Sequence, residues 1–135
     1  MDAGTDSGSS GPGPTITSSD YAVVAHGGRV RLTGTGFTGV TGVQIGGVTQ
    51  TFVVVGDTTI DVTNVPDTTP LALRPVTLAG PIPQTGTFDV TVIHLVVTEV
   101  DNETSAGADV LQFIEVETGV PDANLTGYIV VVYGG

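Results

Sequence analysis

The sequence contains no cysteine, no tryptophan and no lysine among its 135 residues. Without cysteine the chain can form neither a disulfide framework nor a thiolate metal site, and it has no cysteine nucleophile. Its aromatic residues are four phenylalanines and three tyrosines, too few to favour a carbohydrate cleft built on aromatic stacking. These absences exclude or disfavour several common kinds of catalytic and binding site.

Basic charge is scarce. Only Arg29, Arg31 and Arg74 are basic, against fourteen acidic residues, and the formal net charge is −11. A nucleic-acid binder needs a basic patch for the phosphate backbone, so we expect no nucleic-acid partner. We interpret the acidic surface as a source of solubility. Adaptation to high salt and docking onto a basic surface are the alternatives.

Long apolar runs are also missing. The longest, such as 95–97 and 129–132, have the length of strands and fall far short of the ~20 residues that cross a bilayer as a helix. We therefore expect no membrane segment. Residues 1–6 lack the positive flank and apolar stretch of a secretory signal, which predicts that the chain is not exported by that route.

From Pro14 onward the sequence alternates between apolar and polar residues and is rich in Val, Ile and Thr, as is typical of strands. No helical periodicity appears, so we predict an all-β fold. The predicted strands are 15–17, 21–25, 29–33, 43–45, 51–55, 58–63, 71–73, 76–78, 87–92, 96–101, 110–116 and 128–133. Turns are expected at His26-Gly27-Gly28 and at Gly46-Gly47, a glycine pair suited to a primed hairpin turn.

Alternation also predicts which side chains are buried. Val30 and Leu32 are expected to point inward and Arg31 outward, and the pairs Val43 and Ile45, and Ile60 and Val62, also inward. Four phenylalanines are assigned to the core: Phe37, Phe52, Phe88 and Phe113. Pro75 separates two short apolar segments, and we expect it to confine them to a sheet edge or a bulge, because proline cannot donate to a ladder.

The chain divides into three predicted regions. Residues 1–13 are Gly, Ser, Asp, Thr and Pro without periodicity, which indicates a flexible arm or, for Gly8–Gly11, a cloning remnant. Residues 14–97 form the predicted sandwich. Residues 98–135 are expected to add strands that are completed either by the sandwich or by a neighbouring subunit.

Residues 14–97 resemble an IPT/TIG domain, an immunoglobulin-like module. The resemblance begins at Pro14-Thr15-Ile16-Thr17 and includes Gly27-Gly28. It is carried mainly by Leu32-Thr33-Gly34-Thr35-Gly36-Phe37 and Val43-Gln44-Ile45-Gly46-Gly47, and it ends with the alternating strands 59–62 and 88–92. The resemblance implies a spacer or binding unit of surface proteins, carbohydrate-active enzymes, or phage tail and capsid components. The family has no catalytic residues, so we expect that the chain is not an enzyme.

Residues 96–133 are similar, more weakly, to the opening of a lamin-tail-type β-domain. The similarity is carried by 97–101, 113–116 and 125–130, and it covers less than half of such a domain. If that unit is incomplete, its missing neighbours come from the sandwich or from another copy of the chain, and the second arrangement makes an oligomer.

Few residues suggest site chemistry. His26 and His94 are far apart in sequence and belong to no metal or nucleophile motif, so we expect structural roles for both. Glu99, Asp101, Glu103 and Asp109 could supply hard oxygen ligands for calcium, with Asp101, Glu103 and Asp109 as the candidates. The spacing and central glycine of an EF-hand loop are missing, and a solvated acidic loop is the favoured interpretation. We expect no cofactor.

These features favour a non-enzymatic virion structural protein, most simply a capsid decoration (cement) or tail-associated protein of a phage at the virion surface. Its partners would be capsid or tail proteins, and it would self-associate, for example as a trimer. The alternative is an immunoglobulin-like adhesion or spacer module of a larger secreted or cell-surface protein. Both assignments depend on family analogy, because a fold does not specify a function.

Overall fold

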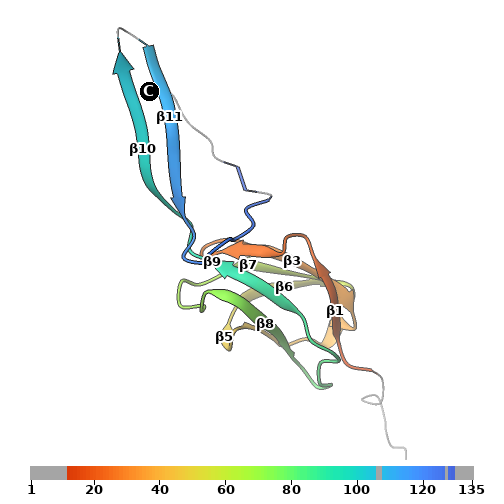
Figure 1. Ribbon diagram of the computed structural model, residues 1–135. Coiled ribbons are helices and arrows are strands. Elements are labelled where there is room, and N and C mark those ends of the chain that lie inside the picture. The colour runs from red at the N-terminus through yellow and green to blue at the C-terminus, as the bar shows by residue number, and fades with distance from the viewer. Residues whose placement is uncertain (1–11, 106–107, 127, 130–135) are drawn as a thin grey trace, which may run out of the picture.

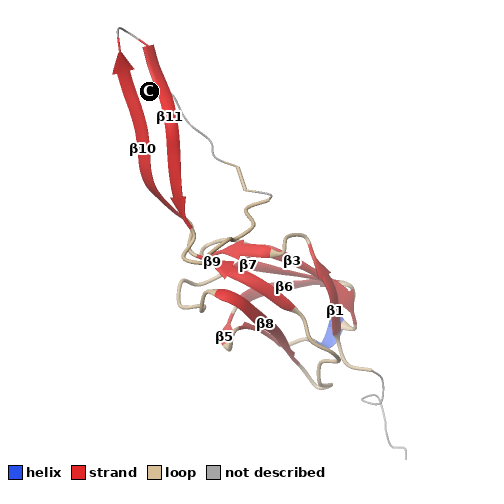
Figure 2. Ribbon diagram, viewed as in Figure 1, coloured by secondary structure: helices blue, strands red, loops and turns tan. Residues whose placement is uncertain are grey.

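The computed structural model describes residues 12–105, 108–126 and 128–129, and for strand residues between 99 and 114 it describes the backbone only. The fold is all-β (Figures 1 and 2). Within the described residues the helical content is one 3₁₀ turn, η2 (Phe37–Gly39). Most of the predicted arm, residues 1–11, lies outside the described residues. No helix in the described part of the chain is both long enough and apolar enough to cross a membrane.

Two sheets form a sandwich. The first has the order β1-β3-β7-β6, all antiparallel. Its strands are β1 (Thr15–Ser19), β3 (Val30–Thr35), β7 (Thr59–Asn64) and β6 (Thr51–Gly56). The second has the order β2-β9-β8-β4-β5, in which β2 and β9 are parallel. Its strands are β2 (Val23–Ala25), β9 (Asp89–Ile93), β8 (Ala72–Ala79), β4 (Gly42–Ile45) and β5 (Val48–Thr49).

This strand order is that of an immunoglobulin-like sandwich. The first sheet corresponds to strands A, B, E and D of that fold, and β4, β8 and β9 of the second correspond to C, F and G. The first strand is divided between the two sheets, because β1 pairs with β3 and β2 pairs with β9. The predicted fold class, an all-β sandwich, is therefore confirmed.

The core lies between the two sheets and follows the predicted alternation. In β3, Val30 and Leu32 are buried while Arg31 is exposed. The other predicted inward residues, Val43, Ile45, Ile60 and Val62, are fully buried. Among the phenylalanines, Phe37 is fully buried, Phe52 and Phe88 pack partly buried against the core, and the side chain of Phe113 lies outside the described residues.

A glycine corner seats Phe37. A Cβ atom on Gly34 would lie 1.9 Å from the carbonyl oxygen of Thr15 and 2.6 Å from the Phe37 ring. Gly36 has φ 75°, a left-handed conformation that is costly for other residues. Both glycines are therefore required for β1 and the aromatic ring to pack closely against the end of β3.

The β4–β5 hairpin turns at Gly46 and Gly47, as predicted. Ile45 pairs with Val48, and both glycines have positive φ, 58° and 84°. Positive φ at both central residues defines a type I′ turn, whose twist suits a two-residue hairpin.

The prediction for Pro75 is wrong. It lies within β8, an interior strand, with no bulge in either of that strand's ladders. β8 changes partners at this residue: 72–75 pair with β9, and 76–79 pair with β4. Because β4 ends at Ile45, no ladder bond requires the N–H that Pro75 lacks, and its carbonyl still accepts a bond from the Gly46 N–H at 2.9 Å.

A two-stranded ribbon follows the sandwich. It consists of β10 (Val96–Ser105) and β11 (Ala108–Glu117), which are antiparallel and form a sheet of their own in the described structure. Figure 1 shows the ribbon projecting from the end of the sandwich. Residues 118–126 return to the sandwich without forming a strand. Of the predicted strand 128–133, Tyr128 and Ile129 are not in a strand, and 130–133 lie outside the described residues.

Candidate functional site

Two histidine side chains, His26 and His94, meet at the base of the ribbon. β2 and β9 run parallel with Ala25 opposite Ile93, so the residues that follow them, His26 and His94, are neighbours. Their Nδ1 atoms are 3.2 Å apart, and the two rings are tilted by 59° with centres 5.4 Å apart. The rings therefore meet through their nitrogen edges and do not stack.

The contact with Thr69 shows which ring nitrogen of His26 carries a hydrogen. Its Nε2 lies 2.7 Å from the carbonyl oxygen of Thr69. A carbonyl only accepts hydrogen bonds, so Nε2 carries the hydrogen and the Nδ1 lone pair of neutral His26 faces His94. With both rings neutral, the His94 Nδ1–H is the donor to His26 Nδ1.

The backbone holds both histidines in place. The His26 N–H donates to Ile93 O, and the His94 N–H donates to Thr118 O, each at 2.9 Å. Thr118 directly follows β11, so the second bond ties the end of the ribbon to the strand that leads into it. Only His94 and Leu95 separate β9 from β10. This connection is short and hydrogen-bonded, unlike a flexible linker.

A small second core supports this junction. Val23, Ala25 and Ile93 are buried in a cluster of their own. The returning segment covers this cluster with Val120, Ala123, Leu125 and Tyr128. Burial raises the pKa of the Tyr128 hydroxyl above its ordinary value of 10.0. The segment after the ribbon is therefore packed on the sandwich through the outer side of β2 and β9.

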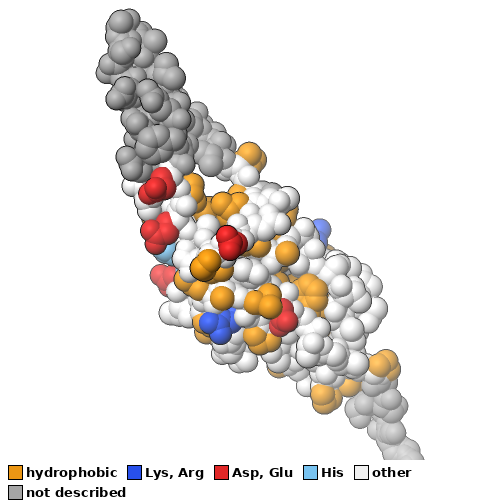
Figure 3. All heavy atoms as spheres, viewed as in Figure 1, with side chains coloured by type: hydrophobic (Ala, Val, Ile, Leu, Met, Phe, Trp, Pro, Cys, Tyr) orange, Lys and Arg blue, Asp and Glu red, His pale blue; other side chains and the backbone are white. Residues whose placement is uncertain are grey.

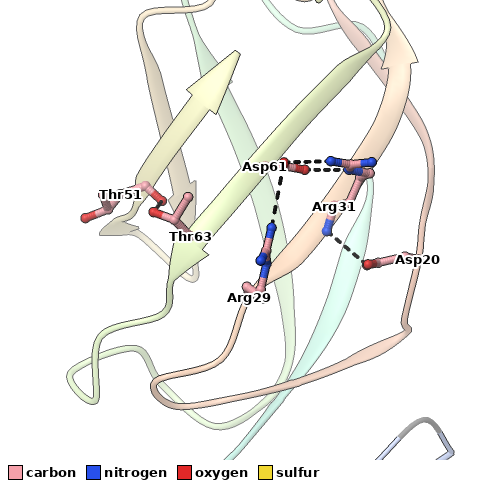
Figure 4. A network of polar contacts seen from close by, with 6 residues as sticks. All are labelled: Asp20, Arg29, Arg31, Thr51, Asp61 and Thr63. Atoms are coloured by element: carbon pink, nitrogen blue, oxygen red, sulfur yellow. Dashed lines mark hydrogen bonds and ion pairs between the residues drawn. The ribbon is translucent and has the colours of Figure 1, made fainter. Parts of the chain in front are cut away.

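A charged network lies on β3 and β7 (Figure 4). Arg31 and Asp61 face each other across the two strands and form a two-pronged pair, Nε–Oδ1 2.6 Å and Nη2–Oδ2 2.8 Å. Arg29 is 3.9 Å from the same carboxylate, and Asp20 accepts the Arg31 backbone N–H at 2.9 Å. The hydrogen bonds from Arg31 hold the pKa of Asp61 below its ordinary value of 3.8, and they raise the pKa of Arg31.

The third basic residue is also engaged within the chain, because Arg74 Nε donates to Leu71 O at 2.7 Å. A separate acid, Asp57, accepts a hydrogen bond from the Thr38 hydroxyl at 2.7 Å, which lowers the pKa of Asp57. These contacts join loops and strands of the sandwich, and the described residues contain no group of three or more His, Cys, Asp or Glu side chains that could hold a metal ion.

The calcium candidates lie toward the far end of the ribbon. Asp101 and Glu103 belong to β10 and Asp109 belongs to β11. The ladder pairs Asp109 with Thr104, and Glu103 with Val110. Glu103 and Asp109 therefore lie on neighbouring rungs of the ladder and not directly opposite each other, while Asp101 pairs with Phe113 farther along the ribbon. Their side chains lie outside the described residues, so the calcium interpretation stays a prediction.

Sequence reasoning missed the histidine pair. Two signals were available: each histidine directly ends an apolar strand, in Val23-Val24-Ala25-His26 and Val92-Ile93-His94. What could not be known from sequence is that these two strands pair in parallel. The Arg31–Asp61 ion pair is easier to predict from the sequence than the histidine pair, because both residues are outward residues of alternating strands.

The chain matches no protein-family model and no curated protein. Its assignment to the immunoglobulin-like fold therefore depends on the strand order described above, and the likeness of residues 14–97 to IPT/TIG domains remains a likeness of motifs.

Proposed function

We propose that the chain is a non-enzymatic structural protein of a virion, a capsid decoration or tail-associated protein that stabilises an assembly through protein–protein contacts. The observation that carries the proposal is the β10–β11 ribbon. Its two strands have ten residues each, and among the described strands they pair with each other alone. A two-stranded ribbon is marginally stable in water and exposes two open edges for further pairing.

The base of the ribbon presents apolar surface. The exposed fraction is 37% for Leu95, 38% for Val96 and 53% for Val97. Single exposed apolar residues are ordinary on a protein surface, so the informative feature is that three of them follow one another at the base of the ribbon. A protein partner seated on the ribbon would bury these side chains and complete its sheet, and this favours a contact role for the ribbon.

The charges support contact through the ribbon more than through the arginines. Arg31 is already paired with Asp61, with Arg29 beside the same carboxylate, and Arg74 is bonded to a backbone carbonyl. On the face drawn in Figure 3, acidic side chains appear where the ribbon meets the sandwich. We therefore propose the ribbon as the contact element and assign the arginines to the stability of the sandwich.

We further propose that residues 14–97 form an IPT/TIG-type module. Two observations support this: the order of motifs in the sequence, and the glycine corner at Gly34 and Gly36 that those motifs build around Phe37. Such modules serve as spacers and binding units, which agrees with a non-enzymatic role.

One observation favours the alternative, a spacer or adhesion module of a longer surface protein. β1 begins at one end of the sandwich, and the ribbon leaves from the other end (Figure 1). Modules joined in series have their connections at opposite ends in this way. In that case the ribbon would link or contact the next module and would not bind neighbouring copies.

The absolute mass of the full chain, measured by light scattering after size exclusion, tests the proposal. We expect a closed oligomer such as a trimer. Val97→Asp, at the base of the ribbon, should shift it toward the monomer. The matched control is Val55→Asp on β6, because Val55 is exposed to a similar degree, 56%, and has no acidic partner opposite it in the ladder. A monomer at all concentrations, with a protease-sensitive ribbon, would contradict the proposal and favour the spacer.

A further inference from the structure

His26 and His94 are the only histidines in the chain. We propose that this pair binds a divalent transition-metal ion of the Zn²⁺ type through both Nδ1 atoms. The ion would join the turn after β2 to the base of the ribbon. This inference does not depend on the proposed virion role.

The spacing of the two nitrogens fits such an ion. Zn–N bonds of about 2.0–2.1 Å in a tetrahedral site place two ligand nitrogens about 3.3 Å apart. The two Nδ1 atoms are 3.2 Å apart, with their rings meeting edge to edge. The two nitrogens are therefore as far apart as two ligands of one ion, and the rings would rotate so that both lone pairs converge on the ion in place of the shared hydrogen.

His26 is oriented as a metal ligand usually is. Histidine ligands commonly donate their second N–H to a carbonyl or carboxylate, which fixes the tautomer and the ring orientation. Here Nε2 is held by the Thr69 carbonyl at 2.7 Å. That carbonyl is itself well positioned, because Thr69 is 1% exposed, donates its N–H to Pro66 O and accepts a bond from Gln50.

His94 completes the pair from the solvent side. Its backbone is fixed by the bond to Thr118 O, while its side chain is exposed. On binding, the Nδ1 hydrogen of His94 would move through solvent to Nε2, so that both Nδ1 lone pairs face the ion and the net protonation is unchanged. Water would supply the remaining ligands.

The composition of the chain determines which metal ions this site would bind. Imidazole ligands suit Zn²⁺, Cu²⁺ and Ni²⁺, whereas carboxylates suit Ca²⁺ and Mg²⁺. Because the chain has no cysteine and no third histidine, any imidazole-bound metal must use one or both of these residues. The fourteen acidic residues are the competing ligands, and the experiment must separate the two kinds.

The test is a titration of the full chain, prepared without a polyhistidine tag, with ZnCl₂ at neutral pH, measured by calorimetry. We expect one Zn²⁺ per chain. His26→Asn and His94→Asn should each weaken binding at least about tenfold, since losing a second-shell group alone costs about 10–100-fold. The control, Asp89→Asn, removes one exposed carboxylate at the other end of β9 and should leave binding unchanged.

A measurement on the unaltered chain guards against misfolded variants. Nitrogen NMR of the two imidazoles should show both Nδ1 resonances shifting together on addition of Zn²⁺ and not on addition of Ca²⁺. The proposal would be overturned by any of three results: no Zn²⁺ binding, binding that persists in the double variant, or a shift confined to one histidine.

Discussion

The sandwich and the ribbon are both built from strands rich in valine, yet their side chains are buried to different degrees. In the sandwich, the inward residues of β3 and β7 are buried by the opposite sheet. At the base of the ribbon, Val96 and Val97 have no such cover and stay 38% and 53% exposed. Valine-rich strands thus form in both regions, but a hydrophobic core forms only where a second sheet packs on the first and buries its inward side chains.

The largest expected difference between the two regions is in amide hydrogen exchange. Amides of β3 and β7 should exchange only when the whole sandwich unfolds, at a cost of about 5–15 kcal/mol. Amides of β10 and β11 should exchange at least about 10³ times faster at low protein concentration, because the ribbon can open alone. Exchange followed by mass spectrometry or NMR measures both.

The same experiment at high concentration sharpens the comparison. If copies of the chain complete the ribbon, its amides should become protected as concentration rises, while those of β3 stay unchanged. Protection of the ribbon equal to that of β3 at every concentration would show that the ribbon is as stable as the sandwich by itself.

Removing a core ring should be the most damaging single change. Phe37→Ala is expected to lower the free energy of unfolding by about 3–5 kcal/mol, because Phe37 is fully buried and its loss leaves a cavity. Val97→Ala in the ribbon should change it by less than about 0.5 kcal/mol. Urea unfolding followed by circular dichroism measures both, and equal losses would contradict the division into core and ribbon.

A smaller effect is expected from turn geometry. Gly47→Ala should cost about 1–2 kcal/mol, because φ is 84° there and a side chain is strained even though nothing lies within 4 Å. Gly56→Ala is the control: the space around Gly56 is also open, but its φ is not in the left-handed region. It should be neutral within about 0.5 kcal/mol, as measured by the urea midpoint. If both variants lose stability equally, backbone strain is not the cause.

The smallest effect concerns pH. The folded-state pKa of Asp61 is lower than its unfolded value of about 3.8, so the unfolded chain binds more protons between these values. The stabilisation is therefore complete above about pH 4 and is lost as pH falls through the folded pKa. Asp61→Asn should lower the urea midpoint at pH 6 by less than Gly47→Ala does, because exposed ion pairs contribute little.

The contrasting result is expected at low pH. Once Asp61 is protonated in the original chain, the Asn variant should be nearly as stable, so the difference between the two should shrink from pH 6 to pH 2. A difference that is independent of pH would show that packing, and not the ion pair with Arg31, determines the effect.

Much of the sandwich follows from local sequence. Alternation located Val30 and Leu32 in the core, and the glycine pair at 46–47 located a hairpin. Pro75 was misplaced for a physical reason: its missing N–H matters only if a partner strand reaches it. Whether β4 ends before that point is a property of the assembled sheet.

At the candidate site, too, features set by neighbouring residues can be predicted from the sequence, whereas features set by strand pairing cannot. The sequence by itself determined the all-β class, the inward and outward faces and the tight turns, because these depend on near neighbours, steric limits and a period of two. Only the tertiary structure decided that β2 pairs in parallel with β9 and so brings His26 to His94, 68 residues away. That pairing depends on how two sheets divide the first strand between them, which no short stretch of sequence encodes.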